Sequence, residues 1–243
     1  MKVPDTMTSE FEISGPFEIS RLLRGETEFI ATCSRQWVTR RFILQIAVIV
    51  LGAGLYGATM GWWRGPQQAL FVAIKFPLII LFVTGGNALL NGLLAPLLGL
   101  NIRFYQSFSS IVMSFAVTAA ILGAFSPVIA FLVWNAPGMA SKMSGSTYSV
   151  ILLAHVLAIA LAGTTGNLRL FQLLLSLSAQ RAAALRVLGA WLTGNLFLGS
   201  QLTWILRPFI GSPGLPVQFL RADAFHGNFY EAVFRAIHHI LIG

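Results

Sequence analysis

Residues 108–134 read FSSIVMSFAVTAAILGAFSPVIAFLVW, which is 27 consecutive residues without a charged side chain. An α-helix of about 20 apolar residues is long enough to cross the hydrocarbon core of a bilayer. The stretch lies within a longer interval, between Glu28 and Asp223, in which 194 residues include no Asp or Glu. Because a carboxylate at the centre of a bilayer costs about 3 kcal/mol and is kept mainly for a function, this interval is predicted to form a membrane domain.

Four other apolar segments pass the same length test. They cover roughly residues 42–60, 74–98, 148–168 and 183–206. Short connections between consecutive segments favour antiparallel neighbours, whereas Pro77, Pro96 and Pro127 are expected to kink their helices or to end them early. The sequence therefore predicts an all-α fold, an integral membrane bundle of five transmembrane helices.

Amphipathic surface helices are predicted on both sides of the five spans. Residues 17–41 mix apolar side chains with Arg and Glu, and Trp37 suits the depth of the lipid headgroups. Near the other end, Asn228 and Glu231 have the spacing of a helix capping box and precede an apolar stripe. The chain thus divides into an N-terminal polar and amphipathic segment (1–41), a five-span membrane domain (42–206), and a Pro-rich cap that ends in an amphipathic helix (207–243).

Composition and charge limit the partners that the chain can have. Hydrophobic residues make up 56% of the chain and charged residues 10%, whereas soluble domains carry about 25% charged residues. The formal net charge is +8, and the sequence contains no nucleic-acid-binding motif. We therefore expect the positive charge to interact with anionic lipid headgroups rather than with nucleic acid. Arg and Lys residues near the spans number eight on the N-terminal side and five, Lys75 included, on the other, which predicts a cytoplasmic N terminus.

Catalysis and cofactor binding are not expected. Spans without Asp or Glu offer neither paired-carboxylate catalysis nor a carboxylate metal site. The sequence also contains no nucleophile with a credible base and no phosphate-binding Gly-rich loop. The single cysteine, Cys33, cannot form an intramolecular disulfide. We therefore expect a non-enzymatic protein with no catalytic site, no metal site and no cofactor.

Polar side chains inside the spans allow two interpretations. Thr84, Asn87 and Asn91 fall on one face of the second segment, where they either line a path for a neutral solute or form hydrogen bonds between helices. His155 is the only histidine within a span, and it either ligates a haem or pigment metal or bonds to a neighbouring helix. Hydrogen bonding between helices is the interpretation that we favour for both.

Small residues recur at four-residue spacing in two of the spans. They are Gly57 and Gly61 in the first, and Ala154, Ala158, Ala162 and Gly166 in the fourth. Such faces let helix backbones approach closely. Packing within the chain is the favoured interpretation, and homo-oligomerisation through these faces is the alternative.

The segment after the fifth span is the main candidate for contact with a partner or with lipid. Pro208 ends the preceding helix, Asp223 is a candidate counter-ion for Arg207 or Arg221, and Glu231 is placed four residues before Arg235. The candidate surface comprises Trp204, Arg207, Pro208, Phe209, Arg221, Asp223, Glu231 and Arg235. The alternative is that the segment is a lid folded onto its own bundle.

Three short stretches resemble bacterial members of the Yip-domain superfamily. They are LYG at 55–57, QQAL at 67–70 leading to IKFPL at 74–78, and residues 204–213. The eukaryotic members are five-span proteins that interact with Rab GTPases and act in membrane traffic. The resemblance implies a five-span fold with the N terminus inside, in a bacterial inner membrane. The Tyr56-Gly57 pair lacks the proline that follows it in the eukaryotic motif, so no GTPase-binding residue is carried over.

The sequence leads to one functional prediction and two alternatives. We predict a non-enzymatic membrane scaffold or organising subunit that contacts lipid and other membrane proteins through its flanking segments. The first alternative is a small transport subunit for a neutral solute, using Asn87 and Asn91. The second is a pigment-associated membrane subunit, using His155.

Overall fold

The computed structural model describes residues 16–26, 28–29, 38–100, 102–138, 144–178, 180–211 and 216–242. Within these ranges the regular elements are helices, and no strand occurs. The helices are α1 (Pro16–Arg24), α3 (Thr39–Trp62), α4 (Pro66–Leu97), α5 (Phe104–Trp134), α6 (Ser144–Leu177), α7 (Arg181–Leu206) and α8 (Phe229–Ile242). Cys33 and Trp37 lie outside the described residues.

Five of these helices, α3 to α7, are long and apolar enough to cross a membrane. The prediction of an all-α five-helix membrane bundle is therefore confirmed. The predicted start of the second span was wrong, because α4 begins at Pro66 rather than near residue 74. Proline fits the first position of a helix, where its missing N–H leaves no hydrogen bond unmade.

Of the two effects predicted for the internal prolines, a kink or an early helix end, the early end does not occur at Pro77 or Pro127. Helix α4 continues for twenty residues beyond Pro77, and α5 continues through Pro127 to Trp134. Only Pro96 lies close to a helix end, one residue before α4 stops. Proline in a membrane helix is tolerated when neighbouring helices and hydroxyl side chains take over the freed backbone groups.

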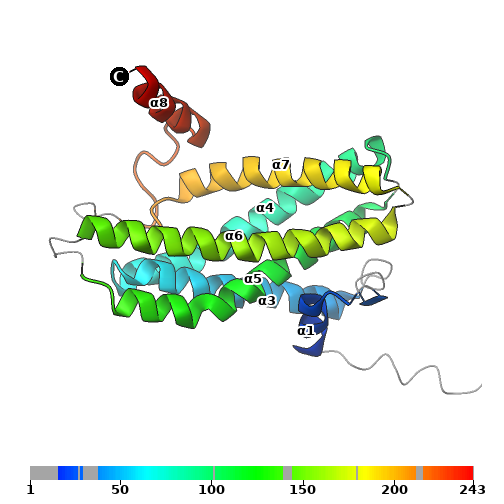
Figure 1. Cartoon of the computed structure of the whole chain (residues 1–243), viewed down its shortest axis with the longest axis horizontal. Coiled ribbons are helices and arrows are strands. Elements are labelled where there is room, and N and C mark those ends of the chain that lie inside the picture. Colours follow the sequence, from blue (N-terminus) through cyan, green and yellow to red (C-terminus); the bar gives the residue numbers. More distant parts are fainter. Residues whose placement is uncertain are drawn as a thin grey trace, which may run out of the picture.

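The five long helices form an elongated bundle in which consecutive helices run antiparallel (Figure 1). Helices α3, α4 and α5 pack against one another, α6 packs on α5, and α7 packs on α4. Helices α6 and α7 contact each other much less than either contacts its other neighbour. One end of the bundle, here called the cap end, carries the end of α3, the start of α4 and the end of α7 (Figure 1). The other end carries α1.

Glycines allow the close approach of α3 to its two neighbours. A Cβ atom at Gly52 would lie 2.3 Å from the backbone oxygen of Ala119 in α5, and one at Gly61 would lie 2.6 Å from the backbone oxygen of Gln68 in α4. Gly57 and Gly166 are similarly close to α4 and α5. Packing within the chain is thus confirmed for the glycines of the two small-residue faces.

Helix α1 is docked on the bundle at the end opposite the cap end. Its Leu22 is buried in a cluster with Met113 of α5 and Leu173 of α6. The Nη2 group of Arg169 in α6 donates a 2.7 Å hydrogen bond to the backbone oxygen of Leu23. The predicted N-terminal surface helix therefore exists, with one face fixed to the bundle.

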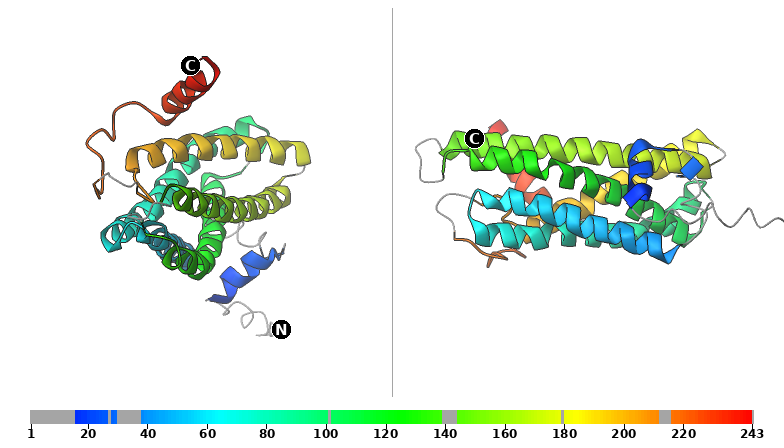
Figure 2. Two further views of the ribbon diagram at one scale, coloured as in Figure 1. Left: turned by 60° about the vertical axis from the view of Figure 1, so that its left-hand side comes forward. Right: turned by 90° about the horizontal axis from the view of Figure 1, so that it is seen from below.

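Helix α8 extends away from the bundle beside α7, on the side opposite α1 (Figures 1 and 2). The backbone N–H of Glu231 donates a 2.9 Å hydrogen bond to the side-chain oxygen of Asn228, which caps the helix. The predicted role of Asn228 as the N-cap residue of this helix is confirmed, because the bond satisfies one of the free N–H groups at the helix start. The predicted pair of Glu231 with Arg235 cannot be placed, since the side chain of Arg235 lies outside the described atoms.

Candidate functional site

A buried lysine marks the cap end of the bundle. The side chain of Lys75, in α4, is fully buried, and its Nζ donates a 3.2 Å hydrogen bond to the backbone oxygen of Pro208. Its Nζ also lies 5.1 Å from the ring centre of Phe219 and 5.9 Å from that of Phe209. Lys75 was counted among the cations near the ends of the spans, but its ammonium group is held inside the protein by a carbonyl and two aromatic rings.

Gln68 makes a second anchor for the same backbone segment. Its Nε2 donates to the backbone oxygens of Pro208, at 3.0 Å, and Phe209, at 2.7 Å. Gln68 is buried, so both bonds are shielded from solvent. We use "the cap" for residues 207–211 and 216–228, the described part of the chain between α7 and α8, which appears in orange in Figure 1. The start of the cap is fixed to α4, as the lid interpretation of this segment requires.

Arg207 links the two described parts of the cap. Its Nη2 lies 3.1 Å from Oδ2 of Asp223, and its Nη1 donates a 2.7 Å hydrogen bond to the backbone oxygen of Trp204. The guanidinium carbon lies 3.8 Å from the centre of the Trp204 ring. Of the two counter-ions considered for Asp223, the structure shows Arg207. Because the Asp223 side chain is 60% exposed, the pair itself contributes at most about 1 kcal/mol.

Replacing Gln68 with leucine is expected to loosen the cap. The change removes both donors and leaves the Phe209 oxygen without its bond, a loss of about 1–3 kcal/mol. Trypsin cleavage of the folded, detergent-solubilised protein after Arg221 should then be about tenfold faster. The matched control is Gln67→Leu, since Gln67 is exposed. Equal cleavage rates in the two variants would show that Gln68 does not hold the cap.

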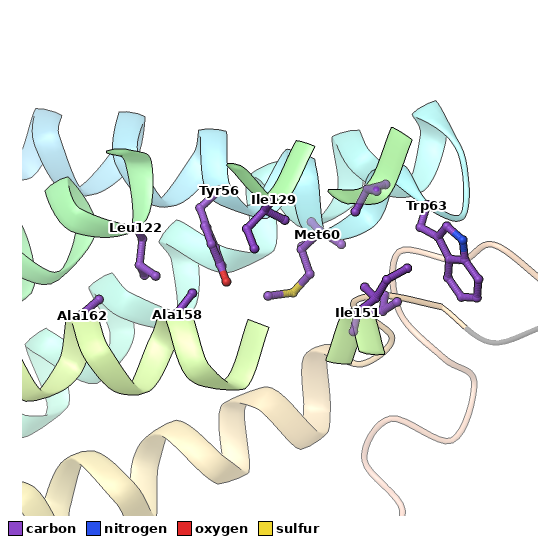
Figure 3. Close-up of a cluster of buried hydrophobic side chains, with 11 residues drawn as sticks. Tyr56, Met60, Trp63, Leu122, Ile129, Ile151, Ala158 and Ala162 are labelled. Carbon is purple, nitrogen blue, oxygen red and sulfur yellow. The ribbon is translucent and has the colours of Figure 1, made fainter. Parts of the chain in front are cut away.

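A tyrosine and a histidine are paired inside the bundle near the cap end. The hydroxyl of Tyr56, in α3, lies 2.9 Å from Nδ1 of His155 in α6, and both side chains are buried. Figure 3 shows Tyr56 pointing its hydroxyl from α3 toward α6. The expected hydrogen bond from His155 to a neighbouring helix is confirmed. Nε2 of the same ring is buried and has no hydrogen-bond partner among the described residues.

Two adjoining cavities lie between α6 and α7, with α4 and α5 behind them. The one nearer the cap has a volume of about 300 Å³ and is lined by His155, Thr203, Phe209 and Ile210, among others. The other has a volume of about 230 Å³ and its lining includes Ser114, Thr118, Asn167 and Asn195. They share Phe76, Ile79 and Ile159. We call the two cavities together the groove.

The predicted polar face of α4 is buried against α7. The Nδ2 group of Asn87 donates to the backbone oxygen of Trp191, at 3.2 Å, and to Oδ1 of Asn195. Asn91 donates to Oδ1 of Asn87, whereas Thr84 bonds to the backbone oxygen of Ile80 in its own helix. These amides join two helices, as the favoured interpretation expected.

Sequence reasoning missed Lys75 and Gln68 as anchors of the cap. A charged residue inside an apolar segment is by default a candidate functional residue, and Lys75 stood only one residue inside the predicted span. Starting that span near residue 74 placed Lys75 at the membrane surface. A predicted helix that began at Pro66 would have placed Lys75 as its tenth residue, inside the helix and away from its end.

The described residues include no cluster of side chains that could bind a metal ion. Among the residues that the structure describes, no three His, Cys, Asp or Glu side chains come together.

Comparison with known proteins adds no relative to these observations: the chain matches no protein-family model, no curated protein and no solved structure.

Proposed function

We propose that the protein is a non-enzymatic integral membrane scaffold that presents α8 to other membrane components. The observation that carries the proposal is the contrast between a fixed cap and an almost free helix. The cap is held by Gln68 and Lys75. Among the α8 side chains that the structure describes, contact with the bundle is made mainly by Tyr230, whose ring stacks on Phe197 of α7 with centres 5.7 Å apart. A fixed base that holds an amphipathic helix with exposed side chains is suited to recruiting a partner.

Exposed aromatic side chains support a contact role for this region. Phe225 in the cap is 75% exposed and Phe234 in α8 is 67% exposed, although neither belongs to a membrane-spanning helix. Apolar groups gathered outside the spans mark contact with lipid or with another protein. We propose that α8 lies in the membrane interface and meets anionic lipid and the membrane part of a partner there.

Mass spectrometry of cross-linked native membranes tests the scaffold proposal. We expect at least tenfold less cross-linked partner to be recovered with the double variant Phe225→Ser/Phe234→Ser, because it removes the two most exposed apolar side chains among those described in the cap and α8. The control is His226→Ser/His238→Ser, which changes exposed polar residues of the same two elements. Recovery of a lone monomer from native membranes would contradict the proposal.

We further propose that the cap end faces away from the cytoplasm of a bacterial inner membrane. With Lys75 inside α4, the sequence leaves four Arg and Lys residues in the segments on the far side of the spans from the N terminus, against eight on the side of the N terminus. The four are Arg64, Lys142, Arg207 and Arg221. Positive charge favours the cytoplasmic side. The resemblance to the Yip-domain superfamily implies the same orientation.

Reporter fusions test this orientation. Alkaline phosphatase fused after Gly243 is expected to be active, because it folds only outside the cytoplasm. Green fluorescent protein exported in an unfolded form to the same place is expected to be dark. Fluorescence from the second fusion together with inactivity of the first would reverse the proposed topology.

A further inference from the structure

We propose that the groove between α6 and α7 binds one acyl chain of a membrane glycerophospholipid, whose ester carbonyl accepts a hydrogen bond from Nε2 of His155. The inference does not rest on the proposed scaffold function, because α8 takes no part in the groove. Three observations carry it: a buried hydrogen-bond donor without a partner, an elongated apolar cavity, and an opening toward the bilayer.

The hydrogen-bond network assigns the proton of His155. Nδ1 of the ring lies 2.9 Å from the Tyr56 hydroxyl, whereas the other acceptor within reach of that hydroxyl, the backbone oxygen of His155, lies at 3.5 Å. We infer that the hydroxyl donates to Nδ1, the nearer acceptor, so that the neutral ring carries its proton on Nε2. This N–H group is buried without a partner among the described residues. A buried donor of this kind calls for an acceptor from outside the chain.

The shape of the groove fits a hydrocarbon chain. Its lining on α6 runs from Leu152 to Asn167, a distance of about 22 Å at the rise of an α-helix. Most of the lining is apolar, and Gly163 leaves an opening in the wall, since a Cβ atom there would meet nothing within 4 Å. The combined space suits a long, narrow apolar group better than a compact solute.

The groove lies between two helices that are long and apolar enough to cross a membrane, so its side opening is expected to face lipid. Val156 and Leu192, on its two rims, are 52% and 41% exposed on membrane-spanning helices. His155 lies seven residues after Tyr148 along α6, which is about 10 Å deeper than a ring at headgroup level. That depth corresponds to the edge of the hydrocarbon core, where an acyl chain begins. An ester lipid entering sideways therefore brings its carbonyl close to His155.

Lipid retention by the full chain tests the inference. We expect native mass spectrometry of the detergent-purified protein to show one bound glycerophospholipid per chain. Gly163→Leu, which fills the groove, should retain at least fivefold less. Gly189→Leu is the matched control, because a Cβ atom at Gly189 also meets nothing within 4 Å and Gly189 does not line the groove. It should retain lipid as the unmodified chain does.

A second pair of variants tests the role of the imidazole. His155→Phe keeps a ring but removes the donor, and should retain at least fivefold less lipid. Tyr56→Phe removes the hydroxyl that bonds to Nδ1 of His155, so the imidazole can carry its proton on either nitrogen. This variant should show a loss of retained lipid that is intermediate between those of the unmodified chain and His155→Phe. Should His155→Phe not fold, the Gly163 pair decides the matter alone.

Photolabelling shows where the chain of the lipid lies. The full-length protein is reconstituted in vesicles of phosphatidylcholine and phosphatidylglycerol that contain a phosphatidylcholine with a diazirine midway along one acyl chain. We expect the tryptic peptide 143–169 to be labelled at least threefold less in Gly163→Leu than in Gly189→Leu. Equal labelling and equal lipid retention in these two variants would overturn the inference, as would a quinone or a free fatty acid recovered in place of the phospholipid.

Discussion

Replacing Gly52 with alanine is expected to lower the melting temperature of the detergent-solubilised protein by about 6–12 °C. The new methyl group would lie 2.3 Å from the backbone oxygen of Ala119 and 2.8 Å from its carbonyl carbon. Backbone atoms cannot rotate away as a flexible side chain can, so α3 and α5 must separate. Overpacking of this kind costs about 3 kcal/mol at the upper end of its usual range. Thermal unfolding followed by circular dichroism measures the effect.

The control for Gly52 is a helical glycine that faces open space. A Cβ atom at Gly189, in α7, would meet nothing within 4 Å. Gly189→Ala should therefore change the free energy of unfolding by no more than about 1 kcal/mol, with a gain expected from helix propensity. If both variants lowered the melting temperature equally, the close crossing of α3 and α5 would not be what limits the stability of the bundle.

Replacing Asn87 with leucine is expected to have the second-largest effect, a loss of about 3 kcal/mol in the free energy of unfolding. Asn87 is fully buried, donates to Asn195 and to the backbone of Trp191, and accepts from Asn91. Leucine has a similar size but leaves the amides of Asn91 and Asn195 without this partner. Each unsatisfied buried group costs about 1–3 kcal/mol. Chemical denaturation in a fixed detergent measures the loss.

Asn167→Leu is the matched control for the asparagine network. The amide of Asn167 donates a 2.8 Å hydrogen bond to the backbone oxygen of Gly163 in its own helix, so its removal should cost less than about 1 kcal/mol. The same variants address the transport alternative. Flux of a neutral solute into liposomes that disappears in Asn87→Leu while the bundle stays folded would favour a transport subunit over the proposed scaffold.

The number of spans could be predicted from the sequence because apolar length decides it. The start of α4 could not, since Gln67 and Gln68 interrupt the apolar pattern before residue 74. Gln68 belongs to a long helix all the same, because its Nε2 group donates to two backbone oxygens of the cap. Gln68 bonds to a residue that lies 140 positions later in the sequence. A hydropathy value does not distinguish such a buried polar residue from one that is exposed to water.

The candidate site was predictable only in part. Charge identified Asp223 and left Arg207 and Arg221 as equal partners, and only the fold brings Arg207 within 3.1 Å. The hydrogen bond of His155 was expected, but its partner Tyr56 could not be named from spacing. The groove could not be predicted either, because it lies where α6 and α7 contact each other little, and helix periodicity sets which face is apolar but not how far two helices stand apart.

The burial of Lys75 also has a consequence for synthesis. Its acceptor, the oxygen of Pro208, follows 133 residues later, which takes a ribosome about 7–27 s at 5–20 residues per second. During that interval α4 has entered the membrane with a cation whose final partner does not yet exist. Because lysine opposes membrane insertion, by about 3 kcal/mol at the centre of a span and by less toward its ends, we expect the nascent α4 to stay near the translocation channel or near α3 until the segment that carries Pro208 has been made.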